Sequence, residues 1–221
     1  MRKCSHKVVA GFLLGIALFA QLGCSSAQKP GASYPKVDPL RVRRAGGVVQ
    51  EITLADAMAY HHRHEDHAHD SSSHEGDHEE AICTGVATGY QAIRFATAKL
   101  FADGAPDASD IRLSVQGGMP GVWDIFELYT GTELTRPAKQ EAKPSLSLES
   151  FVFEAKRLST GQSLRFRLRE GFIPAQFFEL KAQGFGCDHP EVDEIKGRAA
   201  RRILSTAPEE CFDLLTWHHE S

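Results

Sequence analysis

The sequence predicts an α+β domain with a helix-strand-helix-hairpin core and C-terminal helices. Two periodicities support this: some segments repeat apolar residues every three to four positions, and others alternate apolar with polar residues. The third observation is their order, because helical and strand patterns are mixed without strict alternation. The chain has 221 residues, of which 42% are hydrophobic, so it can form one ordinary domain with a real core.

The first half of the predicted core is a helix, a strand and a second helix. Apolar residues at helical spacing predict a helix over residues 84–102. Alternating residues over 111–115 predict a strand. The next helix begins at Pro120, which suits the first turn, and ends at Gly131.

The second half is predicted as a hairpin followed by helices. Alternation over 151–155 and 164–168 predicts two paired strands. Two short helices follow, and the second begins near Asp188, where Asp188 and Glu191 make a capping-box pattern. Residues 183–221 are therefore assigned to a C-terminal helical extension of a core over 81–182.

Residues 1–23 predict an export signal, with a basic head, an apolar run and small residues before a cleavage site. The run is too short to anchor the chain across a bilayer. The Leu-Gly-Cys ending resembles a bacterial lipoprotein box, which implies that Cys24 is lipidated and holds the protein to the membrane. We therefore expect a cell-envelope protein facing the periplasm; Ser25 is compatible with the outer membrane, and a plain secreted protein is the alternative.

Charge and composition divide the remaining chain. Loss of three basic residues with the signal changes the net charge from -4 to -7, which argues against a nucleic-acid partner. Residues 24–47 are polar and predict a tether. Residues 48–80 predict a short ordered element over 48–60, then a His-rich loop that is disordered when no metal is bound.

Seven of the eleven histidines lie in this loop, between acidic residues: His61, His62, His64, His67, His69, His74 and His78. We call residues 61–78 the histidine tract. Imidazole binds divalent transition metals, and a flexible chain can fold several rings around one ion. The tract predicts metal binding, with Zn(II) favoured by availability and Ni(II) or Cu(II) as alternatives. A solvated acidic linker and a pH-responsive loop are the other interpretations.

Cysteine usage singles out one thiol. Once Cys4 is removed and Cys24 is lipidated, three cysteines remain. In an oxidising compartment a disulfide between Cys187 and Cys211 is the favoured pairing, and it leaves Cys83 as the odd thiol beside the tract. A second zinc site made by Cys187, His189, Cys211, His218 and His219 is the alternative for that pair. Simple core packing is the alternative for Cys83.

Two blocks resemble the FmdE family, which is named for a component of formylmethanofuran dehydrogenase. The first, over 83–92, is similar to the family's Cys-Pro-Gly opening and its Gly-Tyr helix. The second, Val-Trp-Asp-Ile-Phe followed by Tyr-Thr-Gly, includes Asp124. The resemblance implies an α+β domain with a metal site at Cys83 and Asp124. The family's His-Gly-His before the cysteine is not matched, since Glu79 and Ala81 stand there.

The leading functional hypothesis is an exported, lipid-anchored metal-binding protein that buffers or delivers a divalent transition metal. One alternative is a metal- or thiol-dependent enzyme with a pocket near Cys83 and Asp124. It is the less favoured, because the chain has no P-loop, dinucleotide fingerprint, nucleophile elbow or zinc-protease motif. The third hypothesis is a non-catalytic interaction domain in the envelope. The sequence does not identify a protein partner.

Overall fold

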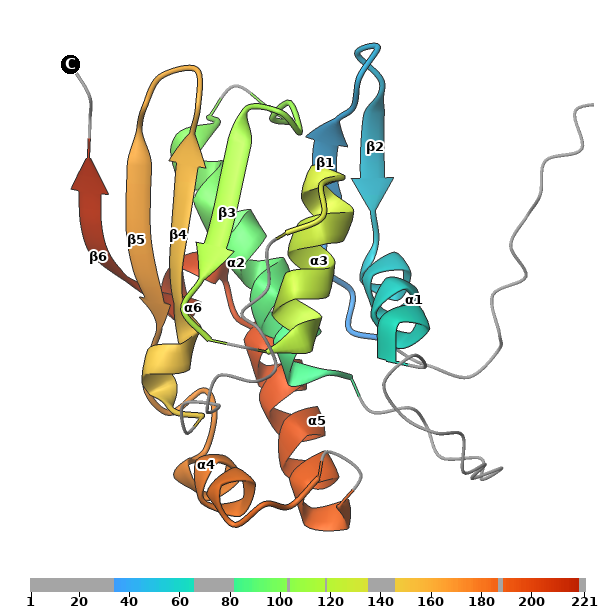
Figure 1. Ribbon diagram of the computed structural model, residues 1–221, viewed down its shortest axis with the longest axis vertical. Coiled ribbons are helices and arrows are strands. Elements are labelled where there is room, and N and C mark those ends of the chain that lie inside the picture. Colours follow the sequence, from blue (N-terminus) through green and yellow to red (C-terminus); the bar gives the residue numbers. More distant parts are fainter. Residues whose placement is uncertain are drawn as a thin grey trace, which may run out of the picture. The chain divides into compact units, whose positions relative to one another are not determined.

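The computed structural model describes residues 34–65, 82–102, 104–117, 119–134, 146–186 and 189–218. Within these ranges it confirms the predicted α+β fold, with helices packed against antiparallel sheets (Figure 1). Several predicted features lie outside the described residues: the export signal, Cys24, Cys187 and the tract histidines His67, His69, His74 and His78. No helix in the described ranges is long and apolar enough to cross a membrane.

The described strands form two antiparallel sheets. The small sheet pairs β1 (Leu40–Arg43) with β2 (Val49–Ile52). The larger one has the order β3 (Ile111–Val115), β4 (Val152–Arg157), β5 (Ser163–Leu168) and β6 (Phe212–His218), each antiparallel to the next. The predicted hairpin is β4 and β5.

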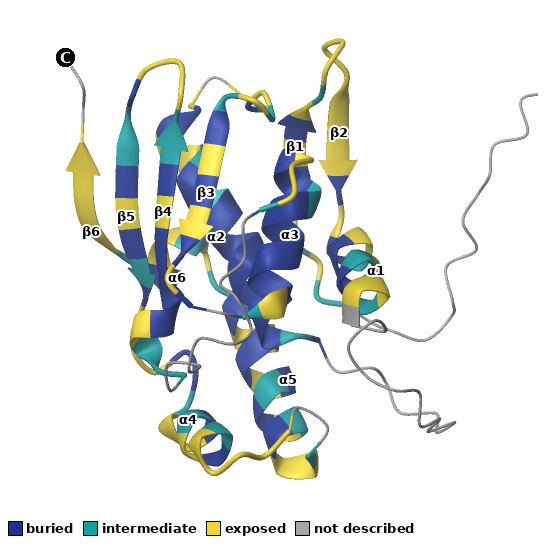
Figure 2. Ribbon diagram, viewed as in Figure 1, coloured by how far each residue is buried: buried dark blue, intermediate teal, exposed yellow. Residues whose placement is uncertain are grey.

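The helices, in chain order, are α1 (Leu54–Glu65), α2 (Thr84–Leu100), α3 (Pro120–Thr130), α4 (Ala175–Ala182), α5 (Pro190–Ser205) and α6 (Pro208–Cys211), with a 3₁₀ turn over Leu148–Phe151 before β4. Helix α2 is central: it contacts β4 and β5 on one side and α3 and α5 on others. Figure 2 shows it dark blue along most of its length.

The core lies between α2 and the larger sheet. Phe95 of α2 packs against Phe166 and Phe212, with ring centroids 4.9 and 5.4 Å apart. Phe153 stacks on Phe166 at 5.4 Å and meets Phe212 edge-on. These aromatic side chains bury large apolar areas and hold the helical layer on the sheet.

Glycines set the close crossing of α2 and α3. A Cβ atom added at Gly89 would lie 2.4 Å from Cγ2 of Ile125, and one at Gly121 would lie 2.8 Å from the amide nitrogen of Val86. A Cβ atom cannot approach another heavy atom this closely, so the absence of side chains at these glycines lets the two helices touch. The crossing matters for the site, because it fixes where the first turn of α2 meets the first turn of α3.

The structure corrects the predicted boundaries at the N-terminal side. The predicted tether over 24–47 extends too far, because its residues Leu40 and Val42 are buried and belong to β1. The histidine tract begins in a helix rather than a loop, because residues 61–65 belong to α1, and residues 66–78 lie outside the described ranges. The predicted element over 48–60 is in fact β2 and most of α1.

At the C-terminal side α5 is confirmed, but it begins at Pro190 rather than Asp188. The extension over 183–221 is also not purely helical, since it ends in β6. That strand is held by its ladder with β5 and buries only Phe212 among its residues, so its apolar pattern alone did not reveal it.

Candidate metal site

Helix α1 places one tract histidine in the core. Its start is fixed by a reciprocal pair: the Asp56 amide donates to Oγ1 of Thr53 (3.1 Å), and the Thr53 amide donates to Oδ2 of Asp56 (2.8 Å). From there Leu54, Met58 and His61 are buried at positions i, i+4 and i+7. His61 therefore occupies a position at which helix spacing expects an apolar residue.

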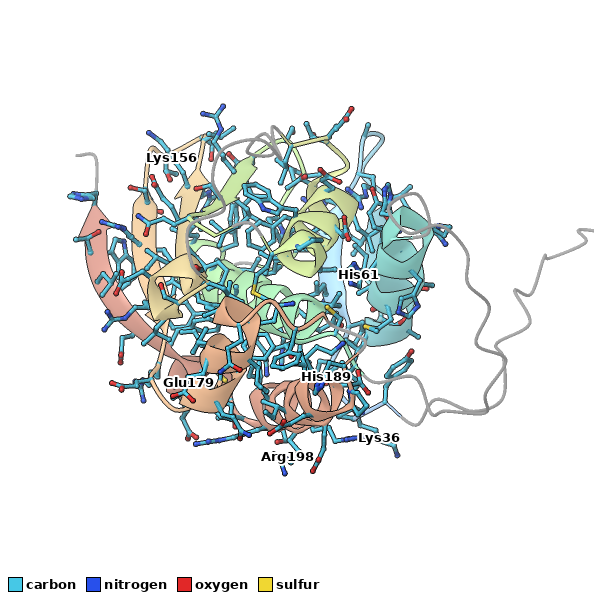
Figure 3. All side chains as sticks on the ribbon, turned by 60° about the horizontal axis from the view of Figure 1, so that its bottom comes forward. Lys36, His61, Lys156, Glu179, His189 and Arg198 are labelled. Atoms are coloured by element: carbon cyan, nitrogen blue, oxygen red, sulfur yellow. The ribbon has the colours of Figure 1, made fainter. Side chains whose placement is uncertain are left out.

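His61 is paired with Asp124 of α3. The distance from Nδ1 of His61 to Oδ2 of Asp124 is 2.5 Å, and the two side chains are only 2% and 1% exposed. A buried carboxylate is costly unless it is bonded, so the pair satisfies both groups. With Nδ1–H donating to the carboxylate, Nε2 carries the ring's lone pair. Figure 3 shows His61 on the side of α1 that faces the domain.

Cys83 borders the same stretch of α3. It is the N-cap residue of α2, is half-buried, and packs against the hydrophobic core. Its Sγ lies close to Gly121, since an added Cβ there would be 2.9 Å from the sulfur. Asp124 follows Gly121 by three residues, which is about one helical turn. The thiol and the His61–Asp124 pair thus meet the same side of α3 within its first turns.

These groups do not form a complete metal cluster. In the ranges that the structure describes, no group of three or more His, Cys, Asp or Glu residues is close enough to hold an ion. His62 is half-buried, with its ring 5.9 Å from that of His61, and His64 is exposed and packs on Tyr60. Among the described tract histidines, only His61 is fully buried.

The structure describes only one partner of the predicted disulfide, Cys211, so the pairing with Cys187 stays a prediction. The structure has Cys211 as a free thiol, fully buried, with Sγ 3.5 Å from the carbonyl oxygen of Ile203. Burial raises the pKa of this thiol to about 12. The side chain is therefore part of the packed interior beside α5. Cys187 itself lies outside the described residues.

The alternative zinc site is not gathered among the described residues either. His189 is the N-cap residue of α5 and packs against Phe185, with ring centroids 4.4 Å apart. His218 is exposed on β6, whereas Cys211 is buried and contacts the Ile203 carbonyl of α5.

Two surface clefts stand out on the described residues. One is bordered by Arg44, Tyr60 and Glu127, and the other by Arg41, Arg94 and Phe101. Neither is lined by His61, Cys83 or Asp124. The enzyme hypothesis expects a deep pocket at these three residues, and these two clefts do not provide it.

Comparison with known proteins gives no relative: no family model, no curated protein and no solved structure matches the chain. The function is therefore argued from the chain's own residues. Sequence reasoning named His61, Cys83 and Asp124 separately, but it missed the buried pair. The signal was present, because His61 continues the apolar stripe of Leu54 and Met58.

Proposed function

We propose that the protein is an exported, lipid-anchored metal-binding protein that buffers or delivers a divalent transition metal, with Zn(II) as the favoured ion. The observation that carries the proposal is the buried His61–Asp124 pair at the base of the histidine tract. A carboxylate that holds one ring nitrogen while the other coordinates is the usual arrangement around metal-bound histidine.

His61, Asp124 and Cys83 each have a role in this proposal. Oδ2 of Asp124 accepts a hydrogen bond from Nδ1–H of His61, which fixes the tautomer and leaves Nε2 as the coordinating atom. Cys83 supplies a sulfur ligand, which suits Zn(II). A bound ion would supply no reaction here; it would be the cargo that the protein holds.

The remaining ligands would come from the tract. Residues 66–81 join α1 to the residue before Cys83, so both ends of the segment start from the same side of α3. A chain of this length keeps its histidines within reach of the pair at high effective concentration. Ordering the segment around an ion costs conformational entropy, which favours a buffer of moderate affinity over a permanent structural site.

The FmdE resemblance supports the same residues. That family carries its histidines directly before the cysteine, whereas here His61 and His62 lie in the last turns of a helix and residues 63–82 separate them from Cys83. We propose that His61 takes the position of the family's first histidine and that the segment after it is an insertion rich in further ligands.

Zinc titration by calorimetry tests the proposal on the chain from Ser25 onward. His61→Asn and Cys83→Ser are expected to weaken the tightest site at least tenfold, and Asp124→Asn to weaken it by roughly 10–100-fold, as is usual for partners of metal-bound histidine. Deleting residues 66–78 should lower the number of ions bound. His218→Asn, on exposed β6, is the matched control and should change neither value.

A thiol- or metal-dependent enzyme is the second candidate, because a histidine–carboxylate pair near a cysteine is also a set used in covalent catalysis. It expects Cys83 to react faster with iodoacetamide when His61 is intact than in His61→Asn. Equal rates, together with normal zinc binding, would leave only the metal-binding role. The third candidate, a non-catalytic interaction domain, expects no zinc binding by any variant.

A further inference from the structure

The outer strand of the larger sheet is unusually apolar. In β6, Leu214, Leu215 and Trp217 are 43%, 42% and 41% exposed. Figure 2 shows most of the strand in yellow at the edge of the sheet. Edge strands are usually protected by lysine or proline, and β6 contains neither. An apolar strand at the edge of a sheet is a template for another strand.

The opposite edge of the sheet is built differently. Strand β3 follows the pattern of a half-buried strand, and its exposed residues are Arg112 and Ser114. Charged and polar side chains of this kind discourage pairing. Exposed large apolar residues are thus concentrated on β6 rather than shared by both edges.

We propose that β6 pairs with β6 of a second copy of this chain, antiparallel about a two-fold axis, so that two four-stranded sheets become one. Two-fold interfaces place the same surface of both copies face to face, and therefore require a self-complementary surface. The order of residues along β6 has this property.

The faces of β6 determine which register is complementary. Leu214 pairs with Phe166 and Trp217 with Leu164, and both partners on β5 are buried on the side of α2. An antiparallel register that sets Leu214 against the second copy's Trp217 therefore puts apolar side chains together on that side, twice by symmetry. This pairing would continue the apolar layer of the core across the interface between the two β6 strands.

The same register brings a hydrogen-bond donor and acceptor together on the other face. Asp213 pairs with Arg167 and His218 with Ser163, so both lie on the side away from α2. The register sets Asp213 against the second copy's His218, whose imidazole N–H can donate a hydrogen bond to the carboxylate. Asp213 also bonds Arg169, with Oδ1 2.8 Å from Nε, which holds its carboxylate in place.

Leu215 adds a further contact. The ladder between β5 and β6 shifts between Arg165 and Phe166, and the register of the described strands gives Leu215 no partner on β5. In the proposed register it lies opposite the second copy's Thr216. Pairing would remove its 42% exposed side chain from water, which a monomer leaves uncovered.

Sedimentation velocity on the chain from Ser25 onward, over a hundredfold range of concentration, tests the proposal. The unchanged chain should dimerise, and Leu214→Lys with Trp217→Lys should weaken association at least tenfold while circular dichroism stays unchanged. The control is Leu158→Lys, an equally exposed apolar residue (43%) outside β6, which should dimerise normally.

Disulfide cross-linking tests the register of the two β6 strands. Leu215→Cys together with Thr216→Cys should give a disulfide-linked dimer on mild oxidation, whereas Leu158→Cys should not. A chain that stays monomeric at every concentration would overturn the proposal. Undiminished dimerisation of the lysine double variant would overturn it as well. Neither result depends on zinc, so failure here is separable from failure of the metal-binding proposal.

Discussion

Gly121→Ala tests whether the close crossing of α2 and α3 supports both the fold and the site. The new Cβ would lie 2.8 Å from the Val86 amide nitrogen and 2.9 Å from Sγ of Cys83. Overpacking of this kind costs about 1–3 kcal/mol. Alanine in place of glycine stabilises a helix by up to about 1 kcal/mol. The gain is smaller here because Gly121 lies in the first turn of α3.

The net destabilisation is therefore about 1–2 kcal/mol. For a chain of this size that lowers the melting temperature by roughly 2–8 °C, measured by thermal unfolding. Gly85→Ala is the matched control at the same crossing, because its nearest backbone atom would be 3.3 Å away and it should cost less. Gly121→Ala should also weaken zinc binding through Cys83. A variant as stable as the unchanged chain would refute the reasoning.

Three further predictions concern the stability of the fold. In a double-mutant cycle, His61→Ala and Asp124→Ala should each cost about 3–5 kcal/mol, and the double variant clearly less than their sum; additivity in urea unfolding would show no coupling. Burial raises the pKa of both Tyr90 and Cys211 to about 12, from 10.0 and 9.0, so stability present below pH 9 should fall towards pH 12, because the unfolded chain loses these protons first. Arg44→Ala removes bonds of 2.8 and 2.7 Å to the carbonyls at the end of α3 and should cost about 2 kcal/mol in the same assay; no measurable loss would contradict that role.

The core elements could be predicted because their residues carry a clear period. The helices α2 and α3 and the hairpin β4–β5 have apolar stripes at helix or strand spacing, bounded by Gly104, Pro120 and Gly131. Strands β1 and β6 could not be found in this way. Each pairs with a neighbour through backbone bonds, and their side-chain patterns are short or one-sided.

The candidate site was also only partly predictable from the sequence. Composition identified the histidine tract, and the position of Cys83 beside it was visible in the sequence. The partner of His61 was not, because Asp124 is distant in the chain and only the packing of α1 on α3 brings them together. Because the tract contains seven histidines, composition alone did not distinguish His61, the one that continues the apolar stripe of α1.

Zinc stoichiometry and affinity of the chain from Ser25 onward, compared between the unchanged protein and His61→Asn, test the central claim most directly. We predict that the unchanged protein binds Zn(II), and that the substitution weakens its tightest site at least tenfold while circular dichroism remains unchanged. Identical stoichiometry and affinity in the two proteins would contradict the claim that the buried His61–Asp124 pair is the base of a metal site.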